Sequence, residues 1–169
     1  ETFIPSVFVQ DSYEINKHFS LLGGLRYDYH KDHKSIITPR FAFRYESKKG
    51  DILRLNAGTG FRVVNLFTEE HAALSGARDV IVLEDLKPEK LYNVNVNYLK
   101  TWMLKDDFIL QAEAAAWYTY FTNSIIPDYD TNPNQIIYKN LEGYAETKGV
   151  SLNVDAVYAN NLKMMLGVT

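Results

Sequence analysis

The feature that most constrains this chain is an alternation of apolar and polar residues with a period of two. Between residues 19 and 30, Phe, Leu, Gly and Tyr occupy the odd-numbered positions, whereas the even-numbered positions include Arg26, Asp28 and His30. The same alternation returns in residues 91–99 and 150–158. Because successive side chains of a β-strand point to opposite faces of a sheet, the pattern predicts strands with one apolar and one wet face.

Shorter runs of the same kind extend the prediction to the rest of the chain. They are residues 40–46, 53–58 and 110–114. The opening run, residues 3–14, is apolar on both faces, and a last strand is expected to begin near Leu162. Residues 112–116 are rich in Ala, but the aromatic residues 117–121 that follow favour a strand there. The sequence therefore predicts an all-β chain, an antiparallel up-and-down meander of roughly eight strands.

The expected connections alternate in length. Tight polar turns are predicted at residues 16–17, 47–51, 105–106 and 160–161. Longer excursions are predicted at residues 31–36, 62–88 and 123–144. This order places all long connections on one side of the sheet, as in outer-membrane barrels, which have short periplasmic turns and long external loops.

Aromatic residues on the apolar face recur at a spacing of ten. The pairs are Phe19 and Tyr29, Tyr92 and Trp102, and Phe108 and Tyr118. Ten residues of a tilted strand cover roughly 25 Å along a membrane normal, the height of the apolar band between two aromatic girdles. The strands also extend over about 10 to 13 residues, whereas strands of soluble proteins cluster near 5 or 6.

Composition excludes several classes of function. The net charge of −3 argues against a nucleic-acid partner. The absence of cysteine excludes disulfides, thiolate metal sites and thiol nucleophiles. No segment approaches the roughly 18 to 20 continuous apolar residues of a membrane helix, a length that barrel strands do not need. We find no paired acid and base and no phosphate-binding loop, so neither an enzyme nor a cofactor is expected.

Two soluble folds share the alternation and stay open as alternatives. One is a ligand-binding all-β domain of lipocalin type, and the other is a cell-surface β-sandwich. Both predict that the apolar face is buried inside a fold that is stable in water.

Several short stretches resemble, in their order along the chain, the barrel half of TonB-dependent receptors. They are Phe8-Val9-Gln10-Asp11, Gly24-Leu25-Arg26-Tyr27-Asp28, Thr38-Pro39-Arg40, Gly60-Phe61-Arg62 followed by Asn65-Leu66-Phe67, Leu86-Lys87-Pro88-Glu89, Asn140 and Lys148-Gly149-Val150. One departure is Val63-Val64, which follows Arg62 where the family has Ala-Pro.

The resemblance implies a bacterial outer-membrane barrel of about 22 strands closed around a plug. Residues 1–169 would then be a fragment of that barrel without the plug. The implied function is uptake of a scarce ligand, such as a siderophore, cobalamin, metal chelate or glycan, with energy supplied by the TonB complex. The implied partners are outer-membrane lipid, that ligand, and TonB through a plug that this sequence does not contain.

Candidate ligand-binding residues lie in the expected long connections. His30 and His33, with Asp28 nearby, carry imidazole and carboxylate groups that could hold a transition metal or a chelated one. The alternative is a solvated loop whose lysines repel a cation, and no resident metal site is predicted.

A second group of candidates consists of Arg62, His71 and Arg78. Arg recognises anionic oxygens with two parallel hydrogen bonds, which suits a catecholate chelate or a phosphate. Ordinary loop charges, or contacts with a plug, are the alternative. Asp128, Asp130 and Asn132 alternate as in a calcium loop but lack its Gly and closing Glu.

The polar face also carries charge in mid-strand. The residues concerned are Arg26, Arg40, Arg44 and Arg54, with Asp28 and Glu46. Pairing among themselves is one reading, and contact with charges of a plug is the other.

Overall fold

The computed structural model describes residues 3–64, 78–104, 107–159 and 162–169, and all regular structure within them is β-strand. No helix in these ranges is long and apolar enough to cross a membrane. The turns expected at residues 105–106 and 160–161 lie outside the described residues.

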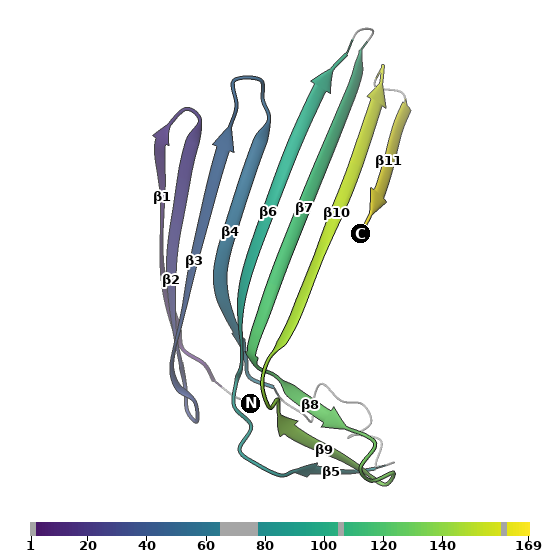
Figure 1. Cartoon of the computed structure of the whole chain (residues 1–169). Coiled ribbons are helices and arrows are strands. Elements are labelled where there is room, and N and C mark those ends of the chain that lie inside the picture. The colour runs from purple at the N-terminus through teal and green to yellow at the C-terminus, as the bar shows by residue number, and fades with distance from the viewer. Residues whose placement is uncertain (1–2, 65–77, 105–106, 160–161) are drawn as a thin grey trace.

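Eight antiparallel strands form one long curved sheet in the order β1-β2-β3-β4-β6-β7-β10-β11 (Figure 1). The strands are β1 (Ser6–Asn16), β2 (Phe19–His30), β3 (Lys34–Glu46), β4 (Ile52–Arg62), β6 (Glu89–Met103), β7 (Phe108–Asn123), β10 (Ala145–Tyr158) and β11 (Leu162–Val168). Because spatial order follows chain order, the predicted up-and-down meander is confirmed. The Ala-rich run 112–116 lies within β7, as the flanking aromatics predicted.

The register of the sheet gathers the alternating residues into two faces. Val94 of β6 lies opposite Ala57 of β4 and Tyr118 of β7, whereas Asn95 lies opposite Asn56 and Trp117. Residues that face each other across strands share a side of the sheet, so the apolar positions form one continuous face and most polar positions the other. From here on these are called the apolar face and the polar face.

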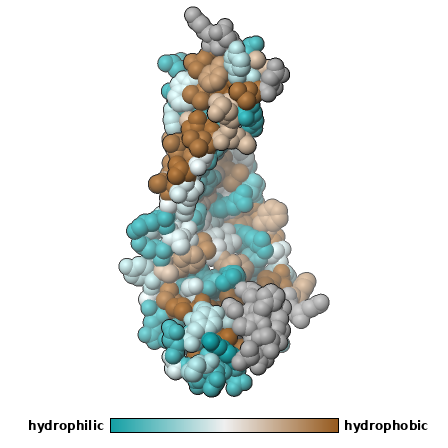
Figure 2. All heavy atoms as spheres, turned by 90° about the vertical axis from the view of Figure 1, so that its right-hand side faces the viewer, coloured by the Kyte–Doolittle hydropathy of each residue, from teal (hydrophilic) through white to brown (hydrophobic). Residues whose placement is uncertain are grey.

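The apolar face stays open to the surroundings. Val94 is 43% exposed and Leu152 is 46% exposed, although both lie in the middle of long strands. Burying a Val or Leu side chain contributes about 1.5–3 kcal/mol, so an open face of this size calls for an apolar partner. The lipocalin and sandwich alternatives require this face to be buried inside the fold, which the described residues do not do. Figure 2 views the molecule from the β11 edge. Hydrophobic side chains gather on the long strands, and hydrophilic ones gather around the lower end, where the longest connections lie.

The connections at the two ends of the sheet differ as expected, with one correction. Residues 47–51 form a tight turn in which Gly50 has φ +84°, a conformation that glycine adopts without strain. The excursion expected at residues 31–36 is wrong in its length, because the turn comprises Lys31–His33 and β3 already begins at Lys34. Pairing continues to this point because Ile36, opposite Asp28, is buried.

The two longest excursions contain a second, small sheet that the alternation did not predict. Its strands are β5 (Asp79–Val82), β9 (Gln135–Asn140) and β8 (Ile125–Asp128), in that order. The expectation of antiparallel pairing between neighbours fails here, because β5 and β9 run parallel and belong to different connections. Ile136 and Tyr138 of β9 are buried and pack against Val64, Val80, Leu86 and Ile125, which gives the small sheet a core of its own.

Candidate functional site at the loop end of the sheet

The candidate residues that the structure describes lie at one end of the main sheet, called the loop end, where the small sheet is attached (Figure 1). The β2–β3 turn lies at this end, and the end of β4 and the start of β6 meet the small sheet there through Arg62 and Glu89. The other end carries the tight turns between β1 and β2 and between β3 and β4, and is called the turn end. The predicted separation of long and short connections is therefore confirmed for the described residues.

His30 and His33 form a stacked pair in the β2–β3 turn, with ring centroids 4.6 Å apart. His30 is buried, and its Nδ1 accepts hydrogen bonds from the backbone N–H groups of Asp32 (3.2 Å) and His33 (3.3 Å). A nitrogen that accepts carries no hydrogen, so the hydrogen of the neutral ring lies on Nε2. His30 thereby closes the turn.

This arrangement argues against a metal ligand at His30. One ring nitrogen is used by the backbone and the other carries a hydrogen, so the ring offers no lone pair to a cation. No cluster of three potential metal ligands occurs within the described ranges. The Nε2–H group, buried and without a partner there, is suited instead to an acceptor oxygen.

The pKa of His33 lies below its usual value. Burial is the largest cause, and the nearby His30 and Lys90 lower the pKa further, while Asp32 opposes them. The influence of Lys90 also indicates that the β2–β3 turn lies near the start of β6. At neutral pH the imidazole of His33 is therefore uncharged.

Asp28 is fully buried and is occupied by a neighbour on its own strand. Its carboxylate accepts hydrogen bonds from Arg26 Nε (2.9 Å) and Nη2 (2.8 Å). Such a bidentate pair leaves the carboxylate little capacity for a cation, so Asp28 pairs with Arg26 instead of completing a metal site with the histidines.

Arg62, the last residue of β4, is bonded to Glu89, the first residue of β6. Arg62 Nε donates to Glu89 Oε2 at 2.7 Å. The other carboxylate oxygen, Oε1, accepts hydrogen bonds from Ser124 Oγ (2.8 Å) and from the Ile125 backbone N–H (2.9 Å). Glu89 is buried, and it joins β4, β6 and the small sheet through one carboxylate.

The hydrogen bonds and the burial of Glu89 shift the pKa of its carboxyl group. Glu89 lies at the loop end of β6, closer to the small sheet than Tyr92. Burial by itself would raise the pKa, but the hydrogen bonds from Arg62, Ile125 and Ser124 and the charge of Arg62 outweigh burial. The net result is a pKa below the usual value, so the carboxylate is ionised at neutral pH.

Two asparagines connect the remaining strands to the same junction. Asn140 Oδ1 accepts the Lys87 backbone N–H (2.9 Å), and its Nδ2 donates to the Asp85 carbonyl (3.0 Å). Asn123 Nδ2 donates to the carbonyl oxygens of Lys87 (3.1 Å) and Pro88 (3.2 Å). Among the described residues, the backbone groups of residues 85–88 have no strand partner, and these two asparagine side chains form hydrogen bonds with them instead.

The other predicted site residues are dispersed. Arg78 is exposed in the bend that precedes β5, and His71 lies outside the described residues. The structure brings His30 and His33 together, holds Arg62 in its pair with Glu89, and leaves Arg78 apart from them, just before β5.

Asp128 has a local role that explains why it does not begin a calcium loop. Its Oδ1 accepts hydrogen bonds from the backbone N–H groups of Asp130 and Thr131 (both 3.0 Å), and its Oδ2 accepts one from the Thr131 hydroxyl (2.7 Å). These hydrogen bonds from Thr131 and Asp130 lower the pKa of Asp128. Both oxygens stabilise the turn after β8.

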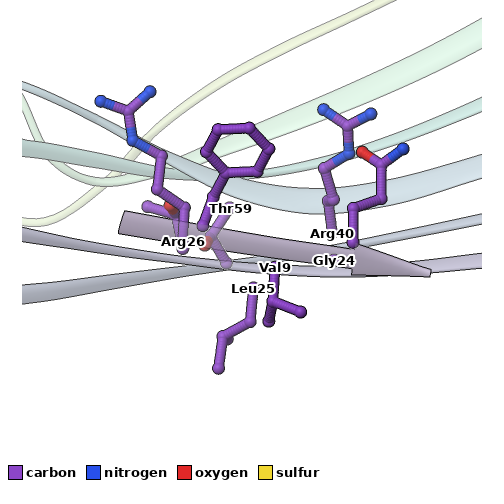
Figure 3. A pocket seen from close by; sticks show the side chains of 9 residues that line it. Val9, Gly24, Leu25, Arg26, Arg40 and Thr59 are labelled. Atoms are coloured by element: carbon purple, nitrogen blue, oxygen red, sulfur yellow. The ribbon is translucent and has the colours of Figure 1, made fainter. Parts of the chain in front are cut away.

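The polar face carries a cavity of about 370 Å³ between β1, β2 and β3. Arg26 and Arg40 extend to one side of the sheet there, and Val9 and Leu25 to the other (Figure 3). Arg40 has no hydrogen-bonding or ionic partner among the described residues. Arg44 forms an ion pair with Glu46, so self-pairing of the predicted charges is confirmed for Arg26 and Arg44.

A meander with one continuous apolar face, a charged opposite face and long connections at a single end defines part of a large β-barrel. The family model described as "TonB dependent receptor-like, beta-barrel" matches residues 2–169. The chain therefore belongs to this family, whose members are transport receptors. A comparison with curated proteins found no match.

Solved structures of receptors share the fold. The siderophore receptor PirA from Pseudomonas aeruginosa is 18% identical with a TM-score of 0.73, over 97% of this chain and 34% of that one. The FrpB iron transporter from Neisseria meningitidis is 17% identical with a TM-score of 0.70, over 96% and 24%. The hemophore receptor HasR from Serratia marcescens is 15% identical with a TM-score of 0.68, over 91% and 32%. The chain thus spans about a third or less of these proteins.

Sequence reasoning missed Glu89, Asn123 and Asn140 as organising residues of the loop end. Two of them, Glu89 and Asn140, stand in stretches that carry the family resemblance, which is the one signal that could have singled them out. The alternation of apolar and polar residues shows which face a strand residue lies on, but it does not predict what a polar residue at the edge of an expected loop binds.

Proposed function

We propose that this chain is part of the barrel of a bacterial outer-membrane receptor that takes up a scarce ligand with energy supplied through TonB. The observation that carries the proposal is the family match over residues 2–169, on a sheet whose apolar face is open. Lipid is the partner that such a face needs, and the wet face then borders the interior of the barrel. The plug and its contact with TonB belong to the remainder of the receptor.

The loop end is the side proposed to meet the ligand. His30, His33, Arg62, His71 and Arg78 are the proposed contacts. Within the described residues the Nε2–H of His30 is a buried donor without a partner, Arg78 is an exposed cation, and Arg62 is held in its pair with Glu89. Donors and cations of this kind suit a ligand with anionic oxygens, such as a catecholate chelate or a phosphate-bearing molecule.

Uptake tests the function directly. Cells that carry the full-length receptor are supplied with radioiron bound to catecholate siderophores, to hydroxamate siderophores or to haem. We expect accumulation of at least one of these above a strain without the receptor, and loss of accumulation when TonB is deleted. Accumulation that is unchanged without TonB would contradict the proposal.

Topology is tested by labelling intact cells with a membrane-impermeant maleimide. Asn132→Cys, in the connection between β8 and β9, should be labelled, whereas Lys49→Cys, at the turn end, should be protected until the outer membrane is permeabilised. Ser75→Cys, in the connection before β5, is expected to behave like Asn132→Cys. Labelling of Lys49→Cys alone would invert the proposed orientation.

A further inference from the structure

A niche of about 400 Å³ opens at the turn end of the sheet, far from the loop-end residues. It lies between the start of β2 and the β3–β4 turn, and the residues that matter to it are His18, Phe19, Tyr45, Lys48, Lys49 and Asp51. None of them has a part in the ligand-binding region proposed above.

One wall of the niche is aromatic and continues the apolar face. The ring centroids of Phe19 and Tyr45 are 4.8 Å apart, and those of Phe19 and Phe43 are 6.0 Å apart. Phe19 and Tyr45 lie opposite each other in the register, so both point to the apolar face. Aromatic rings at the edge of an apolar band are typical of the membrane–water interface.

The other side of the niche is basic. Lys48 and Lys49 are adjacent and exposed in the β3–β4 turn. Ser47 Oγ holds this turn in shape, because it accepts the backbone N–H groups of Lys49 (3.2 Å) and Asp51 (3.0 Å). The two ammonium groups therefore extend from an ordered backbone beside the aromatic wall.

The single carboxylate of the niche does not cancel this charge. Asp51 Oδ1 lies 4.0 Å from Lys100 Nζ, and Lys100 also lies over the Trp102 ring, 5.4 Å from its centroid. With Lys100 counted, three lysines face one carboxylate. His18 is fixed at the rim by its Nδ1, which donates to the Glu46 carbonyl oxygen at 2.8 Å.

We propose that this niche binds the phosphodiester headgroup of an anionic phospholipid in the membrane leaflet at the turn end. The phosphate lies against Lys48 and Lys49, and the first part of an acyl chain lies against Phe19, Phe43 and Tyr45. The inference rests on the proposed function, because it requires the apolar face to meet lipid. Charge complementarity and the continuity of the aromatic wall with that face select a lipid over a soluble anion.

The test uses the full-length receptor in nanodiscs and native mass spectrometry of the lipids that stay bound. Probes are phosphatidylglycerol and phosphatidylcholine of equal acyl chains, with glycerophosphoglycerol and inorganic phosphate as soluble anions. Each lysine near an anionic surface contributes roughly fivefold in affinity, so Lys48→Gln with Lys49→Gln should weaken retention of phosphatidylglycerol more than about tenfold. Lys163→Gln, at the same end but on the polar face, is the matched control and should change it little.

Retention of phosphatidylglycerol over phosphatidylcholine, lost in the double variant and kept in the control, supports the niche. Equal retention of both lipids, equal loss in the control, or equally tight binding of the soluble anions overturns it. Outer-membrane fractionation and heat-modifiable migration of the wild-type receptor separate the two proposals. A receptor absent from the outer membrane overturns both, whereas an embedded receptor without lipid preference overturns the niche alone.

Discussion

The indole of Trp117 on β7 lies against the backbone of Gly149 on β10, directly opposite in the register. A Cβ atom at position 149 would come within 2.2 Å of Trp117 Cζ2, closer than any packed atom can lie. The absence of a side chain at Gly149 is therefore what lets the ring cover the polar face of two strands.

Gly149→Ala should consequently destabilise the barrel by about 1–3 kcal/mol, the usual cost of overpacking. The free energy of unfolding of the full-length receptor in detergent, from denaturant titration, measures this. Gly23→Ala is the matched control, because an added Cβ there meets nothing within 4 Å. Equal effects of the two changes would show that glycine is needed at 149 for another reason.

Val96 and Asn95 lie side by side in β6 but point to opposite faces. Arg at a midplane lipid-facing position costs about 2–4 kcal/mol, and much less where the side chain reaches water. Val96→Arg should therefore lower barrel stability in lipid more than Asn95→Arg does. A greater loss for Asn95→Arg would mean that the polar face is a packed interior.

Glu89→Gln should loosen the attachment of the small sheet to the main sheet. The change removes the charged partner of Arg62, and a hydrogen bond to a charged group contributes about 1.5–3 kcal/mol. Its loss should raise the equilibrium constant for local opening of the junction roughly tenfold or more. The Ile125 backbone N–H donates a hydrogen bond to Glu89 Oε1, and its hydrogen exchange should accelerate by that factor. Glu142→Gln, an exposed carboxylate in the same connection, should leave this amide unchanged.

The β2–β3 turn should lose stability on mild acidification. The pKa of His33 is lower in the folded state than its usual 6.5, mainly through burial, so the unfolded turn binds the proton more readily. Stability is full above the unfolded pKa, falls as the pH drops from there to the folded pKa, and is constant below it. Hydrogen exchange of residues 31–33, corrected for its intrinsic pH dependence, should show this decline.

His33→Asn should flatten that pH profile, because it removes the titrating ring while the hydrogen bonds of His30 Nδ1 to the turn remain possible. An unaltered profile in this variant would contradict the assignment of the effect to His33.

The main sheet was predictable because each of its strands carries its own signal. A residue such as Val94 or Asn95 shows its face through its nearest neighbours in sequence, and tight turns force adjacent strands to pair. The strand boundary at Lys34 was missed because Lys, Asp and His around it are typical of a loop. The pairing with β2 extends β3 to that point, and Ile36 is buried there opposite Asp28.

The small sheet and its attachment could not be predicted in the same way. Val80 and Ile136 are separated by more than fifty residues, and nothing in either segment encodes a parallel pairing with the other. The role of His30 was likewise hidden, since a histidine in a polar turn gives no sign that its ring accepts two backbone N–H groups. Interactions across long sequence separation determine the small sheet and its attachment, whereas His30 acts within its own turn.

The parallel pairing of β5 with β9 ties the two longest connections into a single mechanical element. Neither connection can swing away from the barrel mouth unless it carries the other along or breaks the register from Asp79–Gln135 to Val82–Tyr138. As long as this register is kept, a change in the position of β5 therefore requires a matching change in the position of β9.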